Sequence, residues 1–184
     1  MNRFAATPFA ILLALSLLLT AGTGGAQTTA QRMSPETARA NYVAAFGSYV
    51  EWPASAFADA EAPFVIGVMD DEVTLRLLEA GFKTRRLQGR AVQVRRVDNI
   101  LQAIHVHLLY TPEGNAAPLR PLNGLPILTI GSGTGFLDRG GIIGLLMREE
   151  QLRFELNAKA AERSGLKVSA KLQQLALRTY EESR

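Results

Sequence analysis

The stretch that decides the fold is FVIGVM, residues 64–69, which Pro63 precedes and the acidic pair Asp70-Asp71 follows. An apolar run this short, bounded by a proline and by charged residues, predicts a buried β-strand. A helix is predicted over residues 72–80, because leucines recur there at helical spacing and a glycine lies at its end. A strand followed by a helix is the repeating unit of an α/β sheet.

The strand pattern recurs along the chain over residues 92–97, 106–110 and 127–130. Helical or loop crossovers separate these apolar runs, which indicates a parallel sheet that is covered on both faces. Residues 141–147 and 152–156 are also strand-like, and the link between them is too short for a parallel crossover. We therefore predict an α/β fold of three layers, in which flanking helices cover a mostly parallel sheet with a C-terminal antiparallel edge hairpin.

Cap residues and apolar stripes predict the helices. Ser34 is the expected N-cap of a helix that continues until Trp52-Pro53. Asn157 caps a helix that ends at Gly165. Ser169 caps the last helix, whose apolar stripe consists of Leu172, Leu175, Ala176 and Thr179.

The N-terminal residues 1–26 predict a signal peptide, because a lone cation precedes the apolar run 9–21 and small residues lead up to Ala26. The run is shorter than the roughly 20 residues that span a bilayer. We expect cleavage after Ala26, a mobile leader over 27–34 and a single domain over 35–184. A retained membrane anchor is the alternative.

Charge and cysteine content exclude several function classes. The 20 Lys and Arg against 17 Asp and Glu give a net charge of +3, and the basic residues form no long stripe, so a nucleic-acid partner is not expected. The chain has no cysteine. That excludes a disulfide scaffold, a thiolate metal site, a cysteine nucleophile and a lipid-modified cysteine, so we expect a soluble protein without direct membrane insertion after cleavage.

Two polar features follow predicted strands, at the edge where open α/β sheets bind ligands. Asp70 and Asp71 follow the first strand, and their alternative role is to cap the next helix. Ser132 and Thr134 lie in a glycine-rich loop that lacks the spacing of a nucleotide-binding loop, and a flexible turn explains its glycines equally well. One candidate function is therefore a small-molecule binding module in which these four residues bind the ligand.

No combination of residues predicts catalysis, a cofactor or a metal site. His105 and His107 lie two apart on a predicted strand and so share a face, but no third metal ligand is evident beside them. Ser132 is outside the GxSxG pattern of a hydrolase nucleophile. We expect a protein that is not an enzyme and acts by binding.

Nine blocks of sequence carry a resemblance through their order and spacing: YV with Phe46 (42–46), YVEWP (49–53), IGV (66–68), LQGR (87–90), HLLY (107–110), PILTIG (126–131), Phe136 with GGII (140–143), LRFELN (152–157) and SGLKVSAKL (164–172). Together they resemble the YfiR-like family of periplasmic regulators. The resemblance covers residues 38–177.

The resemblance implies a periplasmic, non-catalytic regulator. Such a protein binds the periplasmic domain of an inner-membrane diguanylate cyclase and inhibits it, which lowers cyclic di-GMP and biofilm formation. A second implied partner is an outer-membrane OmpA-like lipoprotein that sequesters the regulator, and a homodimer is left open. Related domains also serve as sensors, so the alternative is a small-molecule binding or sensor module that acts with a histidine kinase or a transporter.

A regulator without a catalytic site acts through a surface, and the predicted edge hairpin supplies one. We expect the partner-binding residues around its turn and along a nearby extended link: Arg148, Glu149, Arg153, Glu155, Leu166 and Val168. Core packing is the alternative for Leu166 and Val168. The first helix around Tyr42 and Phe46 is the alternative interface.

Overall fold

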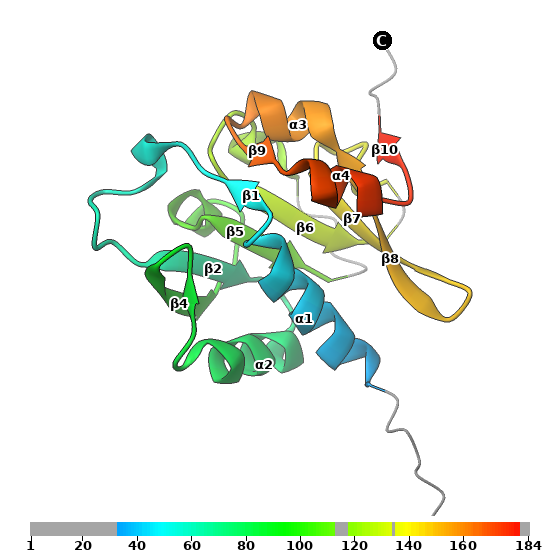
Figure 1. Ribbon diagram of the computed structural model, residues 1–184, viewed down its shortest axis with the longest axis horizontal. Coiled ribbons are helices and arrows are strands. Elements are labelled where there is room, and N and C mark those ends of the chain that lie inside the picture. The colour runs from blue at the N-terminus through cyan, green and yellow to red at the C-terminus, as the bar shows by residue number, and fades with distance from the viewer. Residues whose placement is uncertain (1–32, 113–117, 134, 181–184) are drawn as a thin grey trace, which may run out of the picture. The chain divides into compact units, whose positions relative to one another are not determined.

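The computed structural model describes residues 33–112, 118–133 and 135–180, and its centre is an eight-stranded mixed sheet (Figure 1). The strands are β1 (Val50–Glu51), β2 (Phe64–Val68), β3 (Arg86–Leu87), β4 (Arg90–Arg96), β5 (Leu108–Thr111), β6 (Leu128–Ser132), β7 (Ile143–Arg148), β8 (Gln151–Asn157), β9 (Lys167–Val168) and β10 (Thr179–Tyr180). The helices are α1 (Pro35–Phe46), α2 (Glu72–Phe82), α3 (Ala158–Arg163) and α4 (Ala170–Leu175), with 3₁₀ turns η1 (Ala54–Ala56), η2 (Gln102–His105) and η3 (Arg120–Leu122).

The strand order in the large sheet is β10-β8-β7-β6-β5-β2-β4-β3. Strands β4, β2, β5, β6 and β7 pair in parallel, and β7 pairs with β8 as an antiparallel hairpin. The predicted α/β fold with a mostly parallel sheet is therefore confirmed. Because β2 lies between β4 and β5, the chain changes direction across the sheet here, and such a switch point is where α/β sheets bind ligands.

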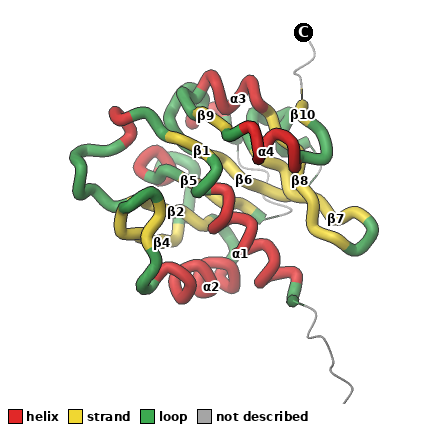
Figure 2. Tube along the Cα trace, in the orientation of Figure 1, coloured by secondary structure: helices red, strands yellow, loops and turns green. Residues whose placement is uncertain are grey.

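The two faces of the sheet are covered differently (Figure 2). Helices α1 and α2 pack on one face, where Ile66, Leu108 and Ile130 belong to the main core with Val43 and Leu78 of the helices. On the other face Val65 and Leu109 pack against Ala103 of η2 and Leu122 of η3. The third layer thus consists of 3₁₀ turns and loops.

The predicted caps of three helices are confirmed. Ser34 Oγ accepts a hydrogen bond from the backbone N–H of Thr37, and Pro35 occupies the first position of α1, where its missing N–H costs nothing. Asn157 caps α3 and Ser169 caps α4 in the same way.

The first helix is shorter than predicted. It ends at Phe46, and β1 then pairs with β9 in a separate two-stranded sheet, with Val50 opposite Val168. Gly47 allows the close approach of the chain here, since a Cβ at this position would lie 2.6 Å from Leu87 Cδ2. Tertiary packing overrides the helical spacing of Tyr49 and Val50.

The last helix is also shorter than predicted, and the hairpin is not the outermost element of the sheet. Helix α4 ends at Leu175, and Thr179 belongs to β10 instead of a helical stripe. The Leu177 N–H donates to Phe154 O at 2.8 Å, and the Leu156 N–H donates to Arg178 O at 3.0 Å. The chain end therefore satisfies backbone groups that a free edge would expose.

The predicted signal peptide and most of the predicted leader lie outside the described residues. Among the helices that the structure describes, none has the length and apolar character needed to cross a membrane.

Candidate functional site

The exposed side of the β7–β8 hairpin brings together four of the residues predicted to bind a partner. Arg148, Glu149, Arg153 and Glu155 line one open groove of about 500 Å³, together with Leu177 and Arg178 from the chain end. We call these six residues the hairpin surface. Leu177 and Arg178 are not among the predicted binding residues, because the sequence pattern predicts a helix there and a two-residue strand such as β10 has almost no local signal.

Strand alternation produces this surface. Phe154 and Leu156 of β8 point into the core beneath α1, so Arg153 and Glu155 point to the opposite face of the sheet. The turn that joins the strands has Glu149 at φ 50° and Glu150 at φ 60°. Two successive residues with positive φ are what a tight hairpin turn requires, because their twist matches that of the strands.

An ion pair fixes one side of the hairpin surface. Arg178 Nε lies 3.2 Å from Glu155 Oε1, and Arg178 Nη2 lies 3.2 Å from Glu155 Oε2. Arg153 donates to Gln151 Oε1 at 2.8 Å. The hairpin surface therefore carries both positive and negative side chains, and the exposed apolar side chain of Leu177 lies among them.

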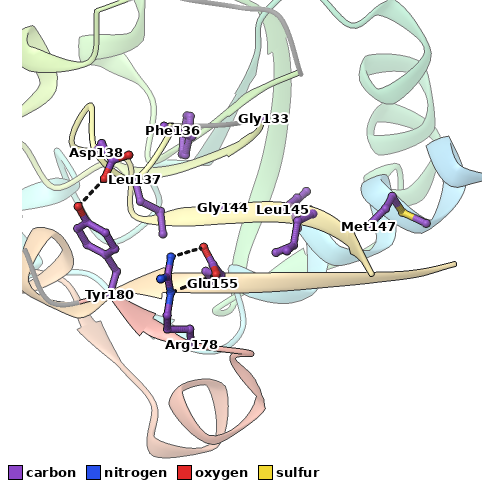
Figure 3. Close-up of a pocket in the computed structure, with 12 residues that line it drawn as sticks. Gly133, Phe136, Leu137, Asp138, Gly144, Leu145, Met147, Glu155, Arg178 and Tyr180 are labelled. Carbon is purple, nitrogen blue, oxygen red and sulfur yellow. Dashed lines mark hydrogen bonds and ion pairs between the residues drawn. The ribbon is translucent and has the colours of Figure 1, made fainter. Parts of the chain in front are cut away.

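A second cavity, of about 540 Å³, adjoins the same ion pair (Figure 3). Its wall includes Phe136 and Leu137, and the Tyr180 hydroxyl donates to Asp138 across it. Phe136 lies between two glycines: a Cβ at Gly131 or at Gly141 would lie 2.2 Å from a ring carbon. This packing explains the glycines of this region better than a nucleotide-binding loop does.

Leu166 and Val168 do not line the groove. Leu166 is 4% exposed in the core, and Val168 is partly buried opposite Val50. Their positions favour the alternative of ordinary core packing.

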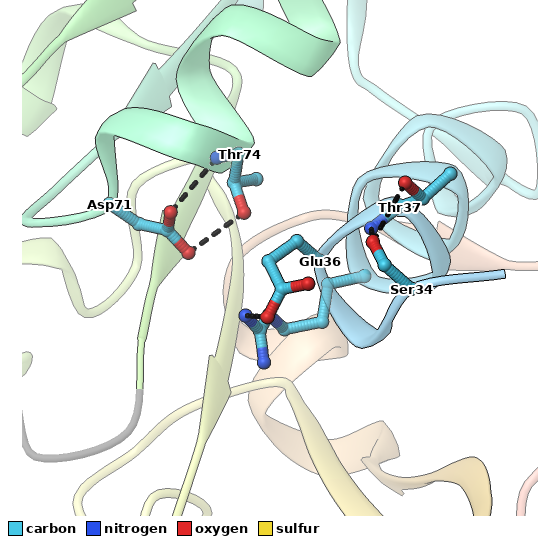
Figure 4. A network of polar contacts seen from close by, with 6 residues as sticks. Ser34, Glu36, Thr37, Asp71 and Thr74 are labelled. Carbon is cyan, nitrogen blue, oxygen red and sulfur yellow. Dashed lines mark hydrogen bonds and ion pairs between the residues drawn. The ribbon is translucent and has the colours of Figure 1, made fainter.

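The four residues predicted to bind a small molecule do not form one site in the described part of the chain. Asp71 caps α2, because its carboxylate accepts from the Thr74 N–H at 2.9 Å and from the Thr74 hydroxyl at 2.7 Å (Figure 4). Asp70 is exposed at φ 53°, Ser132 ends β6, and Thr134 lies outside the described residues. The capping role of Asp71 is thus confirmed, and at most Ser132 remains beside a cavity.

The prediction that His105 and His107 share one strand face is wrong. His105 belongs to η2 and is exposed, whereas His107 precedes β5 and both of its ring nitrogens contact the backbone of other segments. Within residues 33–112, 118–133 and 135–180, no three His, Asp or Glu side chains form a group that could hold a metal ion.

Comparisons with known proteins agree with this architecture. The YfiR/HmsC-like family model matches residues 36–177. A conserved domain protein from Vibrio cholerae O1 biovar El Tor has a similar fold, with a TM-score of 0.51 at 14% identity over 80% of this chain. This chain spans 60% of that protein. No curated protein matches the chain.

Proposed function

The chain belongs to the YfiR/HmsC-like family, and we propose that it binds the periplasmic domain of a membrane diguanylate cyclase and inhibits it. The family is regulatory and not catalytic. Inhibition lowers cyclic di-GMP and with it biofilm formation. A soluble periplasmic form, released by cleavage after Ala26, is part of this proposal.

The hairpin surface is the observation that supports a contact site for the cyclase. Four charged side chains from two strands and a turn lie around one groove, beside the exposed Leu177. Specific interfaces combine apolar anchors with a charged rim of this kind. The alternating signs of Arg148, Glu149 and Arg153 favour a partner with an alternating pattern of its own, since like charges that face each other across an interface are costly.

An outer-membrane OmpA-like lipoprotein is the second proposed partner. A lipoprotein that sequesters the regulator has to compete with the cyclase, so we place its contact on the same hairpin surface. A homodimer through this surface would also compete with the cyclase.

Charge-swap variants test the contact site without removing the internal ion pair. Glu155→Arg with Arg178→Glu keeps the pair but inverts its orientation, and Arg148→Glu with Glu149→Lys inverts the turn. We expect each double variant to weaken binding to the purified periplasmic domain of the cyclase by about tenfold to a hundredfold, which corresponds to ~1–3 kcal/mol. Titration calorimetry measures the loss.

The matched control is Glu79→Lys in α2 with Lys83→Glu directly after this helix, where both side chains are exposed and outside the groove lining. This variant should bind as the parent does, and all three should unfold at nearly the same temperature. Undiminished binding by both hairpin variants would move the interface elsewhere, first to α1 around Tyr42 and Phe46.

A further inference from the structure

The outer side of β4 has no neighbouring strand over most of its length. Strand β3 pairs with β4 only at Arg86 opposite Ala91 and at Leu87 opposite Arg90. Strand β2 lies along the other side of β4. The open edge therefore spans residues 92–96, and it lies at the opposite end of the strand order from the β7–β8 hairpin (Figure 1). We call residues 92–96 the β4 edge.

Backbone groups along the β4 edge point away from the rest of the sheet. The Val97 N–H donates to Val68 O at 2.9 Å, so the odd-numbered residues before Val97 also bond toward β2. Backbone groups alternate in direction along a strand, and those of Val94 and Arg96 therefore point outward. Within the described part of the chain, no strand pairs with these outward groups. A row of open N–H and C=O groups is a template for an added strand.

The charge around this edge has a single sign. Residues 83–96 contain six cations and no Asp or Glu: Lys83, Arg85, Arg86, Arg90, Arg95 and Arg96. Arg96 forms an ion pair with Glu72 of α2, and Arg90 donates to backbone carbonyls of residues 59–62. Arg86 and Arg95 donate only to backbone carbonyls, and neither takes part in an ion pair among the described residues. Their positive charges are therefore available to a partner.

The two faces of the β4 edge differ in chemistry. Val92 and Val94 pack against the main core and are partly buried, so this face is apolar. Gln93 and Arg95 point to the other face, since side chains alternate along a strand. Arg86 shares that face, because it lies opposite Ala91. One face of the edge thus offers valines, and the other offers a glutamine between two arginines.

We propose that the β4 edge binds an extended acidic segment of a partner protein, which joins the sheet as an added strand. The backbone of the segment pairs with the outward groups of Val94 and Arg96. Residues opposite each other on paired strands share a face, so apolar side chains of the segment lie beside Val94 and its carboxylates lie near Arg86 and Arg95. The segment therefore alternates apolar and acidic residues.

Charge favours an acidic segment over a second copy of this chain. Two β4 edges that paired with each other would bring cations against cations, which destabilises a strand pair. Charged residues on an edge protect it from unwanted pairing. Protection by cations alone rejects a second copy and attracts an acidic strand.

Titration calorimetry of the purified protein with a blocked heptapeptide of alternating glutamate and valine tests this site. We expect the peptide to bind about tenfold or more tightly than its counterpart with lysine in place of glutamate. Two further peptides carry backbone N-methyl groups either on every valine or on every glutamate. Only one of these two sets donates to β4, so one methylated peptide should lose binding and the other should keep it.

Arg86→Gln with Arg95→Gln should weaken binding of the glutamate peptide by about tenfold. The matched control is Lys159→Gln with Lys171→Gln, which removes the same charge at exposed positions of α3 and α4 and should bind as the parent does. Both variants should unfold at nearly the parent's temperature, because they change exposed or half-buried surface side chains.

Three results would overturn the proposal: no binding of the glutamate peptide by the parent, unchanged binding by folded Arg86→Gln with Arg95→Gln, or equal binding of the two methylated peptides. Equal binding would show attraction between charges without strand addition. A parent dimer that the glutamate peptide dissociates, measured by analytical ultracentrifugation, would assign the edge to a second copy instead. The test needs no cyclase and the β4 edge lies outside the hairpin surface, so its failure leaves the proposed function untouched.

Discussion

At the scale of single residues, His107 anchors a loop to the sheet through both of its ring nitrogens. Nδ1 accepts from the Val65 N–H at 2.9 Å, and Nε2 lies 3.0 Å from Ala56 O. These partners assign the neutral tautomer with the proton on Nε2, which donates to Ala56 O. Phe57 stacks on the ring at 4.4 Å, so the residues after Trp52 are fixed by a histidine that must stay neutral.

This arrangement predicts that the protein loses stability in mild acid. Burial lowers the pKa of His107 below its ordinary value of 6.5, so the unfolded chain binds a proton more readily than the folded one. The stabilisation that neutral His107 gives the folded state is fully present above pH 6.5 and is lost as the pH falls through the lowered pKa. A protonated Nδ1 can no longer accept the hydrogen bond from the Val65 N–H. Urea unfolding at pH 7.5 and at pH 5 measures the difference.

Variants separate His107 from other titrating groups. His107→Phe should show a smaller loss of unfolding free energy between pH 7.5 and pH 5 than the parent, although it is less stable overall. His105→Gln, which replaces the exposed histidine of η2, should lose as much unfolding free energy between pH 7.5 and pH 5 as the parent does. An equal pH dependence in His107→Phe and the parent would show that His107 is not the responsible group.

At the scale of elements, the end of β6 and the beginning of β7 are joined by the packing of Phe136 between Gly131 and Gly141. Both glycines lie against the ring, and a Cβ at either would overlap it at 2.2 Å. The ring is 3% exposed and cannot swing into solvent without opening the core. Neither Gly131 nor Gly141 has a positive φ, so backbone conformation does not explain these glycines. They are required because the Phe136 ring lies too close to the backbone to leave room for a Cβ.

Gly131→Ala should therefore destabilise the protein by about 1–3 kcal/mol, as overpacking does. Combining it with Phe136→Leu should recover part of that loss, because the smaller side chain removes the overlap. The control is Gly81→Ala within α2, where a Cβ would meet nothing within 4 Å. It should stabilise the protein by ~0.4–1 kcal/mol. Equal effects of the two alanines in chemical unfolding would contradict this account of Phe136.

At the scale of the whole molecule, the sheet was predictable from sequence because each central strand is a short apolar run with a turn or crossover on either side. The edges were not predictable in the same way. Strands β1, β9 and β10 have two residues each, which is too few for any periodicity. Strand β1 pairs with β9 and β10 pairs with β8, so each of these pairings joins segments that are distant in the sequence.

The candidate sites show the same division. The sequence allowed Arg148, Glu149, Arg153 and Glu155 to be placed together because one hairpin holds all four, and strand alternation predicts which side chains share a face. Their contact with a partner stays a prediction. Arg178 could not be predicted in the same way, because its partner Glu155 lies 23 residues away in the sequence. Asp71 illustrates the reverse case, since its local capping role explains it fully.

We propose that this protein restrains a diguanylate cyclase, and the cellular concentration of cyclic di-GMP tests this inhibition most directly. Mass spectrometry of the nucleotide pool should show a rise when the protein is deleted. Complementation with the parent should reverse the rise, and the Glu155→Arg with Arg178→Glu variant should reverse it less well at equal protein abundance. An unchanged or lower pool in the deletion strain, with normal expression in the parent strain, would contradict the account.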